Sequence, residues 1–194
     1  MPQPYPLLYR LGFTPWEQME DEGPLPSLLA SRSPGQALDV GCGTGRQAVA
    51  MAVKGWEVTG VDYVEKPLRT ARARAQAAHV ADRAHFVKGD VTKLDAVLGD
   101  HSHDLVLDVG CMHGLTPTQQ RQFATGVTAH THDGSDLIIL AAAPRTGLGP
   151  KGIDRAGLVA VFPAPWTLVD VADSPQQAGG PLKGATFRWY QLHR

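Results

Sequence analysis

Short apolar runs alternate with longer stretches of helical pattern through the first three quarters of the chain. The apolar runs predict strands at 36–40, 57–61, 85–88, 104–109 and 136–142. The stretches between them predict helices at 46–54, 65–80, 92–98 and 118–130. Strands separated by helices are typical of βαβ units, in which helices cover both faces of a parallel sheet. We therefore expect one α/β domain with a Rossmann-like, doubly wound sheet.

The pattern changes after residue 142. Residues 144–154 are rich in Gly and Pro and predict a loop, and 155–161 predicts a short helix. Two final strands are expected at 167–171 and 185–193. We treat residues 1–194 as a single domain with three parts: an N-terminal segment with a helix (1–30), a ligand-binding core (36–142) and a C-terminal part with the last two strands (143–194).

The five residues LDVGC occur twice, at 38–42 and at 107–111. The residues that follow them differ, and no wider period appears, so an internal repeat is not indicated. Each copy is a strand that runs into a loop at its carboxyl end. Ligands of open α/β sheets bind at this edge, near the point where the strand order reverses. We expect the two copies to form two walls of one pocket.

The first copy leads into a glycine-rich turn. Asp39 is followed by alternate glycines at Gly41, Gly43 and Gly45, with Cys42 between the first two. Glycine allows a positive φ and a close approach of backbone to ligand. A dinucleotide fingerprint would need a small residue where Arg46 stands. The carboxylate of Asp39 would repel a pyrophosphate but attract an ammonium or a sulfonium.

Acidic residues also end the next predicted strands. Asp62 lies about twenty residues beyond the glycine turn, where a carboxylate can accept both hydroxyls of a ribose. Asp90 follows the third strand and could accept a hydrogen bond from an adenine amino group. Asp108 lies near the end of the fourth strand. An acid at each of four successive strand ends predicts a site for an adenosyl ligand.

Composition excludes several classes of protein. The formal net charge is -1 and the chain has no basic stripe, which argues against a nucleic-acid partner. No apolar run reaches the ~18 residues of a membrane span, and the start of the chain does not resemble a signal peptide. Only two cysteines are present, so no disulfide framework is expected. We expect a cytoplasmic protein without a metal site, either a monomer or a homodimer.

The sequences ALDVGCGTG, VTGVDY, KGDV and LVLDVG together resemble the class I S-adenosylmethionine-dependent methyltransferases. The resemblance covers roughly residues 36–142 and implies the strand order 3-2-1-4-5-7-6 with strand 7 antiparallel. It implies that S-adenosyl-L-methionine is the cofactor and S-adenosyl-L-homocysteine the product. The resemblance also assigns cofactor contacts to specific residues. The residues implied are Asp39, Gly41, Cys42, Gly43, Gly45, Asp62, Tyr63, Asp90, Val91 and Asp108.

A narrower resemblance lies near the N-terminus. The stretch GFTPWE at 12–17, with GPLPSLL at 23–29, is similar to the N-terminal segment of the thiopurine, thiol and halide methyltransferases. Glu17 stands where that group has an aspartate, and the spacer before Gly23 is longer. The resemblance implies that Trp16 closes over the cofactor as part of a lid. Alternatively, Trp16 only docks this segment onto the core.

The loop after the second LDVGC copy (107–111) carries the candidate residue for proton transfer. His113 follows the fourth strand and is the imidazole expected to face the methyl group, where it could act as a general base. A base is optional in methyl transfer, since alignment and exclusion of water supply much of the rate. The alternative is that His113 only forms a hydrogen bond within the loop. The apolar residues after strand five could line an acceptor pocket or belong to the core; these are Leu148, Leu158, Phe162 and Trp166.

We therefore expect an enzyme that methylates an O, N or S atom of a small molecule. The loop after the fourth strand lacks the prolines and the aromatic residue with which DNA amino-methyltransferases hold a flipped base. Two other functions stay open at this point. One is a nicotinamide-dependent oxidoreductase, against which Arg46 and Asp39 argue. The other is a protein that binds S-adenosylmethionine without catalysis.

Overall fold

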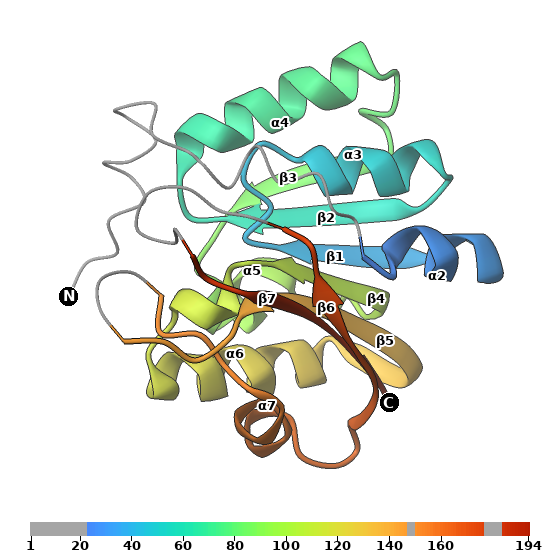
Figure 1. Ribbon diagram of the computed structural model, residues 1–194. Helices are drawn as coiled ribbons and strands as arrows, with labels where there is room; N and C mark the ends of the chain where they lie inside the picture. Colours follow the sequence, from blue (N-terminus) through green and yellow to red (C-terminus); the bar gives the residue numbers. More distant parts are fainter. Residues whose placement is uncertain (1–22, 147–149, 177–183) are drawn as a thin grey trace.

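The structure is a computed structural model that describes residues 23–146, 150–176 and 184–194. A seven-stranded sheet with the order β3-β2-β1-β4-β5-β7-β6 runs through its centre (Figure 1). Strands β1 to β5 are parallel, and β7 pairs antiparallel with both β5 and β6. This arrangement confirms the expected fold class and strand order. The strands are β1 (Gln36–Val40), β2 (Glu57–Asp62), β3 (Ala84–Lys88), β4 (His103–Val109), β5 (Thr131–Ala142), β6 (Thr167–Ser174) and β7 (Phe187–His193).

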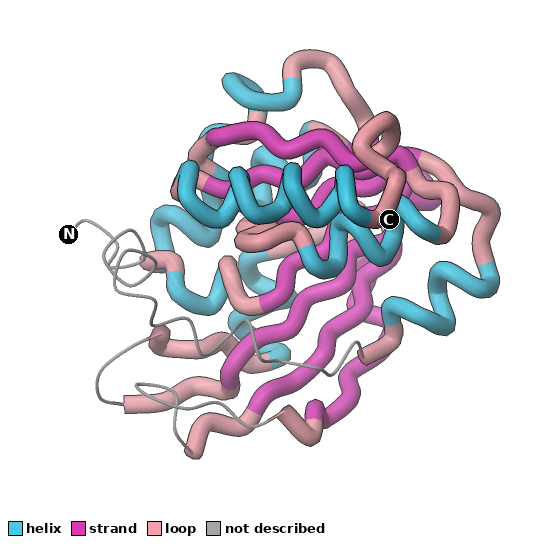
Figure 2. The backbone as a smooth tube through the Cα atoms, turned by 90° about the horizontal axis from the view of Figure 1, so that it is seen from above, coloured by secondary structure: helices cyan, strands magenta, loops and turns pink. Residues whose placement is uncertain are grey.

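Helices cover both faces of this sheet, as Figures 1 and 2 show. One face carries α2 (Leu25–Ser31), α3 (Arg46–Val53) and α4 (Glu65–Ala77). The other carries α5 (Asp95–Leu98), α6 (Pro117–Ala129) and α7 (Arg155–Val161). Two short 3-10 helices follow strands β3 and β4, and they are η2 (Val91–Lys93) and η3 (Met112–Gly114).

Two elements differ from the prediction for local reasons. The helix expected at 92–98 is divided into η2 and α5, because the Asp90 side chain accepts hydrogen bonds from Thr92 and ends the strand in a tight turn. Strand β5 begins at Thr131 instead of residue 136. Thr131 already pairs with His103 of β4, and a shift of register separates this pair from the regular ladder. Pattern alone cannot show such an irregular start.

The core has one apolar cluster on each face of the sheet. Three of the four residues left open as core or acceptor pocket belong to the core. Leu158, Phe162 and Trp166 are buried, and Phe162 makes edge-to-face contacts with Phe123 and Trp166 at ring distances of 6.3 and 6.0 Å. Such pairs stabilise a packed interior. Leu148 lies outside the described residues.

Candidate functional site

The glycine turn follows strand β1 at the carboxyl edge of the sheet. Gly41, Gly43 and Gly45 have φ values of 72°, 51° and 71°, in the left-handed region that favours glycine. The turn is tied to β2, because the amides of Gly41 and Cys42 both donate to the carbonyl oxygen of Val61 at 2.8 and 3.1 Å. Gly45 is the N-cap of α3 and has no capping side chain. The side chain that reaches the first turn of α3 comes from β1, where the Asp39 carboxyl accepts a hydrogen bond from the backbone of Ala48.

The two LDVGC stretches touch one another. Strands β1 and β4 pair directly, with Val40 opposite Asp108. A Cβ atom on Gly41 would lie 2.6 Å from the Cβ of Cys111, so the loop after β4 packs onto the glycine turn. The thiol of Cys42 lies on the other side, beside Gly60 of β2. The expected adjacency of the two strand ends is thus confirmed, although the two thiols contact different glycines.

Asp39 is the buried acid at the base of this site. Its side chain belongs to β1 and is 3% exposed. Burial raises its pKa to about 7; a backbone hydrogen bond from Ala48 lowers the pKa, and the nearby carboxyls of Asp108 and Asp62 raise it. A nearby cation would stabilise the ionised form of this buried carboxyl group and lower its pKa. The geometry therefore suits a ligand that places a positive charge near the first turn of α3.

Asp62 ends strand β2 and holds the glycine turn in place. Its Oδ2 accepts a hydrogen bond from the Gly43 amide at 3.0 Å, and its Oδ1 accepts one from the Val64 amide at 2.8 Å. Each carboxylate oxygen has two lone pairs, so each can still accept a hydroxyl of a ligand. The Asp62 carboxylate therefore holds the backbone of the glycine turn, in addition to the expected contact with a ribose. This structural role was not predicted from the sequence.

The residues expected around the adenine lie at the ends of β2 and β3. Tyr63 follows Asp62 and is 39% exposed. Asp90 is exposed and uses Oδ1 to accept from the amide and the hydroxyl of Thr92 at 2.9 and 2.7 Å. Val91 is buried as the first residue of η2. These positions agree with an adenine rim at this end of the site, which stays a prediction.

Asp108 lies near the end of β4, as expected, and its side chain bonds to the loop that follows. It is fully buried, and its two oxygens accept hydrogen bonds from the amides of Cys111 and Met112 at 2.7 and 2.9 Å. Burial raises its pKa to about 7. Both oxygens therefore fix the loop after β4, and the expected contact of Asp108 with the cofactor stays a prediction. The position of Asp108 in the sequence does not reveal that its side chain accepts hydrogen bonds from the loop that directly follows it.

His113 lies in η3 beneath the end of β5. Its Nδ1 accepts a hydrogen bond from the Ala142 amide at 2.9 Å, so the proton of the neutral ring is on Nε2. The ring is 3% exposed, and burial lowers its pKa to about 4. A general base needs a free lone pair and a pKa near the working pH. In this geometry His113 is a neutral donor through Nε2, which does not support the role of base.

We expect His113→Asn to be tolerated better than His113→Ala. The Oδ1 of asparagine can take the place of Nδ1 and accept from Ala142, whereas alanine leaves a buried N–H without an acceptor, which costs about 1–3 kcal/mol. Urea unfolding of both variants measures the difference. Equal destabilisation would show that the hydrogen bond contributes nothing. Turnover of the asparagine variant close to wild type would exclude His113 as a base.

The remaining histidines lie at the opposite, amino-terminal edge of the parallel strands. His130 contacts Asp95 at 2.9 Å, and His132 contacts Asp104 at 3.2 Å. These pairs link neighbouring elements of the fold. Over the described ranges no cluster of three His, Cys, Asp or Glu residues could hold a metal ion. No helix within those ranges has the length and apolar character needed to cross a membrane.

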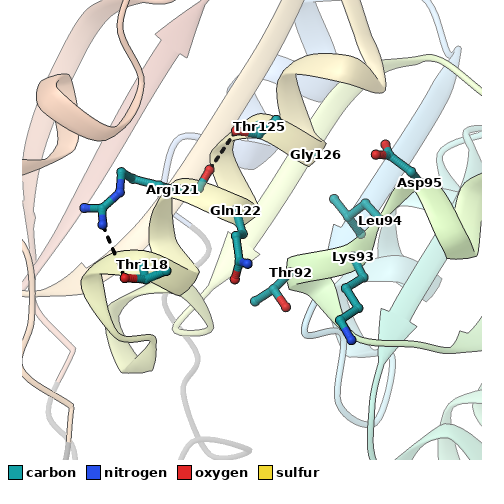
Figure 3. Close-up of a pocket in the computed structure, with 9 residues that line it drawn as sticks. All are labelled: Thr92, Lys93, Leu94, Asp95, Thr118, Arg121, Gln122, Thr125 and Gly126. Carbon is teal, nitrogen blue, oxygen red and sulfur yellow. Dashed lines mark hydrogen bonds between the residues drawn. The ribbon is translucent and has the colours of Figure 1, made fainter.

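A groove of about 310 Å³ lies elsewhere, between η2–α5 and helix α6 (Figure 3). The side chains of Lys93 and Arg121 point away from each other, and Arg121 donates to Thr118. The groove therefore offers no convergent set of charges for a ligand, and we separate it from the site at the strand ends. Its lining residues are Thr92, Lys93, Leu94, Asp95, Thr118, Arg121, Gln122, Thr125 and Gly126.

The expected lid residue Trp16 lies outside the described residues. The first described residue, Gly23, packs on the ring of Trp189 in β7. A Cβ atom on Gly23 would lie 2.2 Å from that ring. This contact places Gly23 over β7, on the face of the sheet that α2, α3 and α4 cover.

One buried polar residue next to the glycine turn was not singled out from the sequence. Gln47, in the first turn of α3, is only 9% exposed. Its Oε1 atom is buried and accepts no hydrogen bond from any residue that the structure describes. A glutamine near a helix start is common and carries no signal of its own. Only its burial beside the glycine turn identifies it.

Comparison with known proteins assigns the chain to a family. It matches the methyltransferase domain family over residues 37–134, slightly more than half of its 194 residues. The 27-O-demethylrifamycin SV methyltransferase of Amycolatopsis mediterranei is 36% identical over 92 residues, covering 47% of this chain and 33% of the relative. The S-adenosyl-L-methionine-dependent Diels-Alderase iliD of Neonectria sp. (strain DH2) is 37% identical over 89 residues, covering 43% of this chain and 34% of the relative. The chain thus spans about a third of the length of these relatives.

Solved structures give the same fold over nearly the whole chain. The 1,6-didemethyltoxoflavin-N1-methyltransferase of Burkholderia thailandensis, solved with its substrate and S-adenosylhomocysteine, has a TM-score of 0.78 and 24% identity. The alignment covers 98% of this chain and 85% of that one. The chain belongs to the methyltransferase domain family, whose cofactor is S-adenosyl-L-methionine. Because the family uses S-adenosyl-L-methionine, the alternative of a nicotinamide-dependent oxidoreductase is not retained.

Proposed function

We propose that this protein transfers the methyl group of S-adenosyl-L-methionine to a small-molecule acceptor. The observation that carries the proposal is the carboxyl edge of β1 and β2, where a glycine turn lies between buried Asp39 and buried Asp62. The turn provides backbone that a ligand can approach, Asp39 provides a carboxyl that favours a cation, and Asp62 retains lone pairs for hydroxyls. These features fit the amino-acid end and the ribose of this cofactor.

The chain's own residues would act mainly by alignment. When bound, the cofactor supplies an electrophilic methyl group on a sulfonium. Asp62 keeps the glycine turn in position, and Asp108 fixes the loop after β4 that packs on Gly41. Two rigid walls in contact would set the angle at which an acceptor meets the methyl group and would exclude water. The neutral ring of His113 would support this wall through its bond to Ala142.

A small molecule is the acceptor class that the observations favour. The net charge of -1 gives no electrostatic footprint for nucleic acid. The rifamycin and toxoflavin methyltransferases among the similar proteins carry small-molecule substrates in their names. The resemblance of residues 12–29 to the thiopurine, thiol and halide methyltransferases favours a sulfur or halide acceptor within this class. That narrower assignment depends mainly on residues outside the described part of the chain.

Two measurements test the proposal. Calorimetry should detect binding of S-adenosylhomocysteine, and a panel of thiols, phenols, amines and halides should reveal an acceptor by release of homocysteine in a coupled assay. Binding without turnover on the whole panel would favour a protein that uses this cofactor without methylation. An absence of binding to both S-adenosylmethionine and S-adenosylhomocysteine would refute the proposal.

We expect the affinity for S-adenosylhomocysteine to rise with pH. Without ligand the pKa of Asp39 is about 7, so below that pH the acid holds a proton that the ammonium of the ligand must displace. Affinity should increase by up to about ten-fold per pH unit between about pH 5.5 and about pH 7, and then level off. Calorimetry across this range measures the slope.

The control for this experiment is Asp39→Asn, which cannot ionise. Its affinity should be lower than that of the wild type above about pH 7 and nearly independent of pH below it. A slope that persists unchanged in this variant would assign the titration to another group, of which Asp108 is the first candidate because its pKa is also about 7.

A further inference from the structure

One ring nitrogen of His113 has no hydrogen-bond partner within the described part of the chain. Nδ1 accepts from the Ala142 amide, so the single proton of the neutral ring is on Nε2. None of the described residues accepts a hydrogen bond from this Nε2–H. The buried side-chain atoms without a partner in those ranges are Gln47 Oε1, Trp56 Nε1 and Arg194 Nε. Nε2 of His113 is not one of them, so this donor reaches the accessible surface although the residue is only 3% exposed.

The edge of the ring that carries Nε2 lies at the carboxyl ends of β4 and β5. A Cβ atom on Gly110 would lie 3.5 Å from Cε1 and 3.9 Å from Nε2 of His113. Gly110 directly precedes Cys111, which packs on the glycine turn. Turning the ring over would break the bond to Ala142, and Phe187 lies beside the ring at a centroid distance of 6.3 Å. The direction of Nε2–H is therefore fixed, at the edge of the sheet where ligands of such folds bind.

The chemistry of a neutral imidazole decides which group fits this nitrogen. Burial lowers the pKa of His113 to about 4, so the ring stays neutral at physiological pH and offers one N–H. This donor suits an oxygen or nitrogen with a lone pair and disfavours an ammonium, which has only donors.

The nucleophilic atom of the methyl acceptor is a poor partner for this N–H. Its electron pair attacks the methyl group, so a hydrogen bond to it would weaken in the transition state and slow the reaction. A hydrogen bond to a neighbouring atom carries no such penalty. We propose that Nε2 of His113 donates to the methyl acceptor and selects small molecules in which a carbonyl oxygen or a ring nitrogen lies next to the methylated atom.

The inference rests on the proposed methyl transfer, and matched probes test it separately. Quinoline-8-thiol and quinolin-8-ol carry a ring nitrogen beside the sulfur or oxygen, whereas naphthalene-1-thiol and naphthalen-1-ol have the same shape without that nitrogen. The coupled assay for homocysteine gives kcat/KM for each probe. The wild type should prefer the quinoline of a pair by about three- to ten-fold, which corresponds to one hydrogen bond. A general defect of a variant cancels in this ratio.

Two substitutions separate the two nitrogens of the ring. Asparagine places an oxygen near Nδ1 and reaches no further, so His113→Asn should keep the bond to Ala142, melt close to the wild type and lose the preference for quinolines. Glutamine places an N–H near Nε2 but leaves the Ala142 amide without its acceptor, so His113→Gln should melt lower and keep the preference. Because glutamine is not a base, a retained preference also separates donation from proton transfer.

The control is His85→Asn, which changes an exposed histidine of β3 and should alter neither melting nor preference. The inference is overturned by a preference that survives in His113→Asn, by a wild type without preference, or by a wild type that methylates other compounds of the panel but neither quinoline. A loss of affinity for S-adenosylhomocysteine of more than about two-fold in His113→Asn would also overturn it, since Nε2 would then contact the cofactor. If the wild type binds S-adenosylhomocysteine but methylates no compound at all, the proposed function fails instead.

Discussion

Replacing Gly41 by alanine should abolish measurable cofactor binding, with a loss of at least about a hundred-fold. The φ of 72° is strained for any residue with a Cβ. The added atom would also lie 2.6 Å from the Cβ of Cys111, so either the glycine turn or the loop after β4 must move. The free energy of unfolding should fall by about 2–4 kcal/mol. Urea unfolding and calorimetry with S-adenosylhomocysteine measure the two effects.

Two further variants separate the strain from the clash. Gly184 has a φ of 75° and open space at its Cβ position, so Gly184→Ala carries a similar backbone strain without a contact. It should lose about 1–2 kcal/mol and keep its affinity. Adding Cys111→Gly to Gly41→Ala removes the atoms that the new methyl group meets and should restore part of the affinity. No recovery in the double variant would assign the whole effect to the backbone.

The second large effect is expected from Asp62→Ala. The substitution leaves the amides of Gly43 and Val64 without their acceptor, at about 1–3 kcal/mol for each buried group. It also removes the expected contact with the ribose hydroxyls. The affinity for S-adenosylhomocysteine should therefore fall by more than ten-fold, because a charged hydrogen-bond pair and the shape of the turn are lost together. Calorimetry and urea unfolding again provide the readouts.

Asp104 offers a matched control for Asp62. Its Oδ2 accepts a hydrogen bond from the Gln36 amide at 2.7 Å, at the opposite edge of the sheet. Asp104→Ala should reduce stability by the loss of this bond and of the contact with His132, and it should leave the affinity unchanged. If the two variants lose stability but neither loses affinity, Asp62 only shapes the turn, and the assignment of the ribose is wrong.

The sequence alone determined the layers of the fold and the edge that carries the site. Alternating apolar and helical stretches give βαβ units, and in a parallel sheet the carboxyl ends of the strands share one edge. The prediction of four strand-end acids around a glycine turn therefore followed from local pattern. The strand order came from a family resemblance, because periodicity along the chain does not state which strands are neighbours. The structure confirmed that order.

Tertiary structure decided what each side chain at that edge does. Asp62 and Asp108 have the same residue type and similar sequence settings, yet Asp62 bridges two loops and Asp108 turns back onto its own loop. The tautomer of His113 depends on the amide of Ala142, which is 29 residues away in sequence. The unmet acceptor of Gln47 is visible only when its surroundings are assembled. Patterns along the chain fix local conformation, but hydrogen-bond partners and burial arise from contacts between distant residues.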